Sequence, residues 1–150
     1  MITRQTDCLI LGGGLAGWMA AREAAAAGLK TMLLHDGMGA SPWVHGFNVP
    51  VYPEDSADIF LQDTLASGQG LSDPALARAL CQDAAEVFDE IRAMGLSFNR
   101  EKDGSYQALR PLGASWPRVV SIGNETGAAI LTRLKEMLKG SVTELPATRA

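Results

Sequence analysis

Residues 7–17 read DCLILGGGLAG, an apolar run followed by a GxGxxG turn whose glycines are Gly12, Gly14 and Gly17. The apolar run, residues 8–11, is typical of a strand that is covered on both faces of a sheet. In a turn of this kind Gly12 permits the sharp bend, Gly14 leaves room for a pyrophosphate beside the backbone, and Gly17 lets the next helix pack against the strand. The segment therefore predicts the start of a dinucleotide-binding fold.

A helix and a second strand follow this turn at the expected distance. Residues 18–27 favour helix throughout, and Gly28 is placed to end it. Residues 31–34 are a second apolar run and complete a βαβ unit. The N–H groups and the positive dipole end of the helix face the turn, so we expect the turn to hold the pyrophosphate of a dinucleotide. The residues concerned are Gly12, Gly13, Gly14, Leu15, Ala16 and Gly17.

The composition excludes several classes of protein. The chain is 150 residues long, which is enough for one domain with a hydrophobic core. It is 47% hydrophobic and 20% charged. A net charge of −4 leaves no basic surface for nucleic acid, and no run is long enough to cross a bilayer. Cys8 and Cys81 are interpreted as small buried residues, and the two histidines give a metal site little to build on. We expect a cytoplasmic protein without a metal.

Two helices are expected after the second strand. Ser56 can cap a helix that runs to about residue 65, and Asp73 followed by Pro74 can start a longer helix. Apolar residues recur along the longer helix at three- and four-residue spacing and predict one buried stripe. Its members are Leu76, Leu80, Ala84, Val87, Phe88 and Ile91. The acids Asp55, Asp58 and Asp63 predict a solvated helix face.

The last third of the chain predicts a small β-hairpin, a helix and one more strand. The hairpin covers residues 96–109, the helix follows residue 124, and the strand covers residues 142–145. A doubly wound parallel sheet needs further strands to cover its edges. The fold class is therefore α/β, a Rossmann-like dinucleotide-binding fold with inserted helices and a hairpin, and we expect it to be incomplete.

Three later segments carry a family resemblance. Residues 63–74 read DTLASGQGLSDP, residues 94–100 read MGLSFNR, and residues 124–131 read NETGAAIL. Together with the glycine turn, and in this order, they resemble the succinate dehydrogenase/fumarate reductase flavoprotein family, which includes L-aspartate oxidase. The resemblance spans nearly all of residues 6–145. It is a resemblance to the N-terminal part of the FAD-binding domain in that family.

The resemblance implies FAD as cofactor and hydride transfer between FAD and a small carboxylate-type substrate. It also implies that residues 1–150 are the N-terminal portion of the FAD-binding domain, and that the capping or substrate domain is absent from this chain. The catalytic residues of the family belong to that domain and to later segments, so no catalytic residue is assigned. The implied partners are FAD, the carboxylate substrate and either a second chain or a missing C-terminal region.

By the same resemblance, the ribose and flavin contacts fall in the loop after the second strand. His35 stands where dinucleotide folds usually place an acid for the ribose, with Asp36 next. His35 either contacts the ribose or is a surface residue at the strand end. The position of the family's covalent flavin histidine is near Ala40, so we expect FAD to be bound non-covalently. The candidates for the flavin side are Ser41, Gly46 and Asn48.

Three further residues keep alternative interpretations. His45 stands where the family has glutamine, and its side chain either contacts the flavin or packs within the loop. Arg118 matches an arginine of the family and Arg110 lies near it, but a loop arginine bound to backbone carbonyls or a carboxylate is the favoured interpretation. For the whole chain, the alternative hypothesis is a non-catalytic ADP- or NAD-binding module, or a docking subunit completed by a partner chain.

Overall fold

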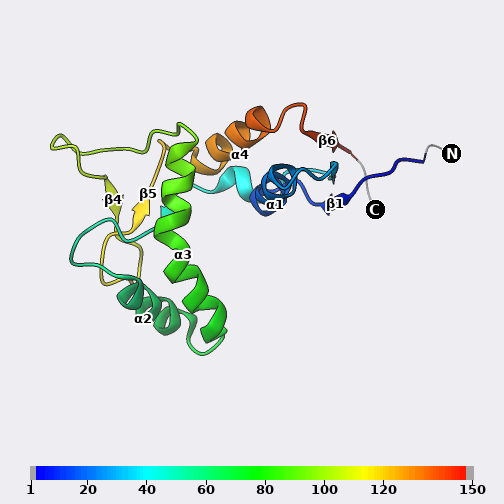
Figure 1. The fold of residues 1–150 in the computed structure, drawn as a ribbon. Helices are drawn as coiled ribbons and strands as arrows, with labels where there is room; N and C mark the ends of the chain where they lie inside the picture. The colour runs from blue at the N-terminus through cyan, green and yellow to red at the C-terminus, as the bar shows by residue number, and fades with distance from the viewer. Residues whose placement is uncertain (1–2, 148–150) are drawn as a thin grey trace. The chain divides into compact units, whose positions relative to one another are not determined.

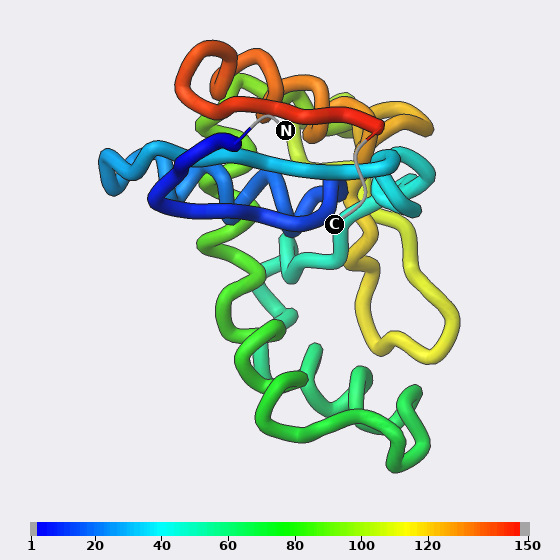
Figure 2. Tube along the Cα trace, turned by 90° about the vertical axis from the view of Figure 1, so that its right-hand side faces the viewer, coloured from blue at the N-terminus to red at the C-terminus, as the bar shows by residue number. Residues whose placement is uncertain are grey.

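The first sheet has three parallel strands in the computed structural model, which describes residues 3–147. The strands are β1 (Cys8–Leu11), β2 (Thr31–Leu34) and β6 (Val142–Leu145). β2 lies between the other two, as Figure 2 shows, with Cys8 and Val142 both opposite Thr31. All three carboxyl ends therefore meet at one edge, where ligands bind in open parallel sheets. The predicted α/β fold with a parallel sheet is confirmed.

Helix α1 (Leu15–Ala26) packs on one face of β1. A Cβ placed at Gly17 would lie 3.7 Å from Ile10 Cγ2, so α1 covers the face that carries Ile10. The helix ends at the C-cap Ala27, and Gly28 follows with φ +77°. On the other face, Leu9 is 53% and Leu11 is 61% exposed. The prediction that residues 8–11 are covered on both faces is therefore wrong for one face, because no described element covers it.

The chain divides into two units. The first contains the parallel sheet and consists of the residues up to Val44 together with those from Gly127 onward. The second is His45–Thr126, which enters the chain between β2 and β6. The first unit also contains the short 3₁₀ helix Ser41–Trp43 and nearly all of α4 (Thr126–Met137).

Helices α2 (Ala57–Gly68) and α3 (Pro74–Ala93) pack against each other in the second unit, as Figure 1 shows. Their predicted starts are confirmed. Ser56 Oγ accepts from the N–H of Ile59, and Asp73 Oδ1 accepts from two N–H groups in the first turn of α3. The end of α2 lies three residues beyond the prediction, with Gln69 in the left-handed conformation as its C-cap.

The buried stripe of α3 differs from the prediction at its N-terminal half. Leu76 and Leu80 are 71% and 60% exposed, and Ala77 and Cys81 are buried instead. Thr64 Oγ1 of α2 lies 3.7 Å from Cys81 Sγ, so small side chains occupy the helix contact. Small residues allow two helices to approach closely, which leucines at these positions would prevent. In the C-terminal half of the stripe Ala84, Phe88 and Ile91 are buried as predicted, and Val87 is half-buried.

A second, antiparallel sheet has the strand order β3-β5-β4. Its strands are β3 (Phe47–Asn48), β4 (Ala108–Leu109) and β5 (Val119–Val120). The predicted hairpin is present as a turn with one bridge, Arg100 to Tyr106, but β4 pairs with β5 and not with residues 96–100. The core of this unit gathers around the ring of Phe88, whose centroid lies 4.8 to 6.1 Å from three other aromatic rings.

Two further findings concern the described residues 3–147. Cys8 and Cys81 are both free thiols. Within this range no helix has the length and apolar composition needed to cross a membrane.

Candidate functional site

The glycine-rich turn joins β1 to α1, and two of its glycines are required by the fold. Gly12 has φ +117°, a conformation that disfavours residues with a Cβ, and its N–H donates to the carbonyl of Leu34 at 2.8 Å. At Gly17 a Cβ would overlap the carbonyl oxygen of Gly12. Gly17 is therefore the residue that lets α1 approach the end of β1.

Gly14 does not need the conformational freedom of glycine. It is the N-cap of α1 with φ −79°, which any residue can adopt. A Cβ there would lie 3.0 Å from Ser41 Oγ and 3.5 Å from the carbonyl oxygen of Met38, so Ser41 would have to give way slightly. Gly14 therefore lets the loop with Met38 and Ser41 lie close to the N-terminus of α1, which is where anions bind helices.

Ser41 supports this helix N-terminus from the loop after β2. Its Oγ accepts a hydrogen bond of 2.9 Å from the N–H of Leu15, the first residue of α1. The loop that contains Ser41 is itself contacted by Gly127, in the first turn of α4. Its N–H donates to the carbonyl of Val44 at 2.8 Å, and a Cβ at Gly127 would overlap the backbone of Ser41.

His35 lies at the end of β2, and both of its ring nitrogens have partners. Nε2 lies 2.8 Å from Glu144 Oε1, and Nδ1 accepts from the N–H of Gly37 at 3.2 Å. Lys135 Nζ donates to the same Glu144 oxygen at 2.9 Å. Burial alone would raise the pKa of Glu144, but the hydrogen bonds and charges of Lys135 and His35 outweigh it and lower the pKa. Glu144 is thus a carboxylate at neutral pH.

The flavin-side candidates Gly46 and Asn48 belong to the second unit. A Cβ at Gly46 would overlap Val119 of β5, so the fold itself requires a glycine at this point. Asn48 is exposed on β3, opposite Val119, and borders a pocket of about 220 Å³. His45 Nδ1 donates to the carbonyl of Asn124 at 2.8 Å, which gives this histidine a structural contact in the loop.

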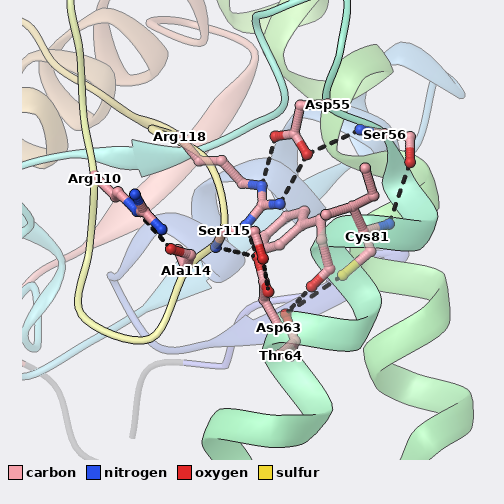
Figure 3. Close-up of polar contacts among 11 residues, drawn as sticks. Asp55, Ser56, Asp63, Thr64, Cys81, Arg110, Ala114, Ser115 and Arg118 are labelled. Atoms are coloured by element: carbon pink, nitrogen blue, oxygen red, sulfur yellow. Dashed lines mark hydrogen bonds and ion pairs between the residues drawn. The ribbon is translucent and has the colours of Figure 1, made fainter.

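Arg118 is buried, with 1% of its side chain exposed, between two carboxylates. It donates twice to Asp55, at 2.6 and 2.8 Å, and once to Asp63, at 2.5 Å (Figure 3). Burial alone would lower the pKa of Arg118, but the hydrogen bonds and charges of the two aspartates raise it. Arg118 is therefore fully engaged in an ion pair. The interpretation of Asp55 and Asp63 as a solvated helix face is wrong, because both carboxylates form ion pairs with the buried Arg118.

Arg110 has a different environment in the same loop. It is exposed, and its Nε donates to the carbonyl of Ala114 at 2.7 Å (Figure 3). Both arginines thus make the contacts favoured from the sequence, one with carboxylates and one with a backbone carbonyl.

We predict that acidification weakens the second unit through Asp63. Burial would raise the pKa of Asp63, but hydrogen bonds from Ser115 and Arg118 lower it below 3.8. A carboxyl whose pKa is lower in the folded state stabilises the fold above the unfolded pKa, and this contribution is lost as the pH falls through the folded pKa. The free energy of unfolding in urea should therefore decline below about pH 4, and it should decline less in Asp63→Asn.

The control for this measurement is Asp83→Asn, which removes an exposed carboxylate from α3. It should keep the pH dependence of the unmodified protein. An identical decline in Asp63→Asn would contradict the role given to Asp63.

The structure brings together some of the residues expected from the sequence. In the first unit, the six residues of the glycine-rich turn lie at the carboxyl edge of the parallel sheet. His35, Asp36 and Ser41 lie at the same edge. Sequence reasoning missed Glu144 and Gly127. The glycine in NETG at residues 124–127 was a usable signal for Gly127, but nothing local marked Glu144. Among residues 3–147, no group of three His, Cys, Asp or Glu side chains is placed to hold a metal ion.

Comparison with known proteins places this site in a family. Residues 7–150 match the family described as the FAD binding domain. The chain is 31% identical over 138 residues to L-aspartate oxidase 2-b of Nicotiana tabacum, covering 90% of this chain and 21% of that protein. It is 32% identical over 141 residues to a subunit of the fumarate reductase (CoM/CoB) of Methanothermobacter marburgensis, covering 88% and 26%. The chain thus spans between a fifth and about a quarter of these relatives.

Solved structures share the fold. FrdA of E. coli quinol fumarate reductase superposes with a TM-score of 0.88 at 23% identity, over 98% of this chain and 26% of that one. Sdh1 of Mycobacterium smegmatis gives a TM-score of 0.85 at 23% identity, over 97% and 28%. At this identity the likeness supports the fold.

Proposed function

The chain belongs to the family of FAD binding domains found in fumarate reductases and L-aspartate oxidases, and from this premise we propose a role in an oxidoreductase. In the proposed role it forms the ADP-binding part of the FAD site. The complete enzyme transfers hydride between FAD and a small carboxylate substrate. FAD supplies the hydride chemistry when it is bound, and the protein supplies position and electrostatics.

The observation that carries the proposal is the position of the glycine-rich turn. Gly12 and Gly17 let α1 begin directly after β1, so the N-terminus of α1 lies at the carboxyl edge of the parallel sheet. The N–H groups and the dipole at this helix end favour a phosphate. The residues present therefore fit the pyrophosphate of FAD.

The remaining contacts follow the carboxyl edge of the sheet. Asp36 is exposed directly after β2, where dinucleotide folds place the acid that binds the ribose hydroxyls. His35 and Asp36 both remain ribose candidates, and both ring nitrogens of His35 have partners within the first unit. On the flavin side we retain Ser41, Gly46 and Asn48, and the alanine at position 40 supports non-covalent binding.

The substrate class is supported by the relatives. They are named for L-aspartate and fumarate, which are both small dicarboxylates. Since the chain covers only a part of either protein, the residues that bind and protonate the substrate are not assigned to it.

The first test is the visible absorption spectrum of the purified protein after addition of FAD and passage through a desalting column. Retained flavin absorbance is expected, and acid precipitation should leave the flavin in the supernatant because it is bound non-covalently. A colourless protein would show that these residues do not hold FAD by themselves. Flavin in the acid pellet would overturn the non-covalent assignment alone.

Gly14→Val should abolish FAD retention, because its branched side chain would displace Ser41, which accepts from the N–H of Leu15, and so disturb the helix end that receives the pyrophosphate. We expect at least about a hundredfold weaker binding, which corresponds to the loss of one or two charge-assisted hydrogen bonds. Gly14→Ala is the graded control, since its Cβ requires only a small shift of Ser41 Oγ, and its stability in urea should stay close to that of the unmodified protein. If Gly14→Val binds FAD normally, the motif is only a turn.

A further inference from the structure

The hydrogen bonds of His35 define its protonation state. The N–H of Gly37 points at Nδ1, so Nδ1 must carry a lone pair and the ring proton must lie on Nε2. Nε2–H then donates to the carboxylate of Glu144. A neutral imidazole satisfies both contacts at once, and only 7% of the side chain is exposed.

The ring also packs directly against the glycine-rich turn. A Cβ at Gly13 would lie 2.6 Å from His35 Cγ and 2.7 Å from the carbonyl oxygen of Gly37. The backbone of Gly13 therefore rests on the imidazole and on the loop that the imidazole holds. Any shift of this ring displaces the residue directly before the N-cap of α1.

A chain of contacts links this ring to three other elements of the first unit. Glu144 lies on β6 and accepts from Lys135 of α4. Lys135 Nζ lies 5.1 Å from the ring of Trp18, which is buried in α1. Glu144 of β6 thus holds the ring of His35. Lys135, which pairs with Glu144, also lies beside Trp18 of α1, the helix that begins at the turn.

We propose that His35 is the positioning residue of the glycine-rich turn. In its neutral form, oriented by Glu144, it fixes Gly37 and Gly13 and so sets the backbone N–H groups that receive the pyrophosphate. It acts through the turn and not by contact with the ribose. This inference rests on FAD binding at the turn.

Two substitutions separate the contacts of the ring. His35→Asn keeps an oxygen at the place of Nδ1, which can accept from the N–H two residues on, as asparagine commonly does in turns. His35→Gln keeps an N–H donor for Glu144 and loses the acceptor for Gly37.

The experiment is the dissociation constant for FAD, measured by titration calorimetry. His35→Asn should bind within about threefold of the unmodified protein. His35→Gln should bind about tenfold more weakly, as expected for one lost hydrogen bond. Urea unfolding of each variant checks that the fold is intact.

Two results would overturn the proposal. One is a loss of affinity in His35→Asn equal to that in His35→Gln, and the other is normal affinity in His35→Gln. If the unmodified protein takes up no FAD, the proposed FAD-binding function fails for this chain, and the following measurement decides the role of His35.

Nitrogen-15 NMR of the protein without FAD reads the ring directly. At about pH 8 the His35 ring should carry its proton on Nε2. The amide resonances of Gly13 and Gly37 should shift in His35→Gln and stay near their places in His35→Asn. A proton on Nδ1, or unchanged glycine amides in His35→Gln, would overturn the proposal without reference to FAD.

Discussion

Replacing Arg118 with alanine should lower the free energy of unfolding by about 3–5 kcal/mol, because it leaves Asp55 and Asp63 without their shared partner. Asp55 has a side chain that is 0% exposed, so its charge would remain buried without a counterion. Alanine keeps the backbone hydrogen bonds of residue 118, in which the carbonyl accepts from Val49 and the N–H donates to Leu109, so the loss reports on the side chain. Urea unfolding of both proteins at neutral pH measures the difference.

The same loop provides the control. Arg110→Ala removes an exposed arginine whose Nε bonds one carbonyl, and it should change the stability by no more than about 1 kcal/mol. Equal losses in the two variants would mean that the loop as a whole, and not the ion pair, carries the stability.

Gly17→Ala should destabilise the fold, although helix propensity alone favours alanine by about 1 kcal/mol. The new Cβ would overlap the carbonyl oxygen of Gly12, and a backbone carbonyl at a tight turn has nowhere to move. We expect a net loss of about 2 kcal/mol, in the range found for overpacked cores, together with loss of FAD retention because the turn itself is displaced. Urea unfolding and the desalting assay report the two effects.

Gly68→Ala is a matched control at another helical glycine. Its Cβ would overlap the Ser72 hydroxyl, which can rotate away, and would lie 3.0 Å from Ser72 Cβ, which needs only a slight shift. This variant should stay within about 1 kcal/mol of the unmodified protein. A gain of stability in Gly17→Ala would show that α1 can withdraw from β1 at little cost, contrary to the packing described.

The start of the fold could be predicted because its signals are local. The bend at Gly12, the close packing at Gly17 and the caps at Ser56 and Asp73 each depend on residues a few positions apart. The exposed positions Leu76 and Leu80 could not be predicted, because helical spacing fits two neighbouring stripes equally well. Contact with α2 selects the stripe with the small residues Ala77 and Cys81.

Contacts between distant residues were also beyond sequence reasoning. His35 and Glu144 lie 109 positions apart, and no pattern around Glu144 distinguishes it from an ordinary strand residue. β5 is a two-residue strand that exists through its pairing with β3 and β4. The position of the glycine-rich turn therefore follows from local sequence, whereas the residues that hold it in place follow from tertiary structure.

The insertion of residues 45–126 between β2 and β6 has a kinetic consequence. During synthesis β1, α1 and β2 leave the ribosome before β6 does. Until β6 is made, the edge of β2 that pairs with β6 has no partner for its hydrogen bonds. That edge closes only when Val142–Leu145 emerges, after all of residues 35–141. Closing so long a loop costs entropy before any pairing is gained, and non-local strand pairing is slow for this reason. His45–Thr126 has a core of its own around Phe88 and can shorten the loop by folding first. The order of synthesis thus favours folding of the second unit before the parallel sheet of the first is complete.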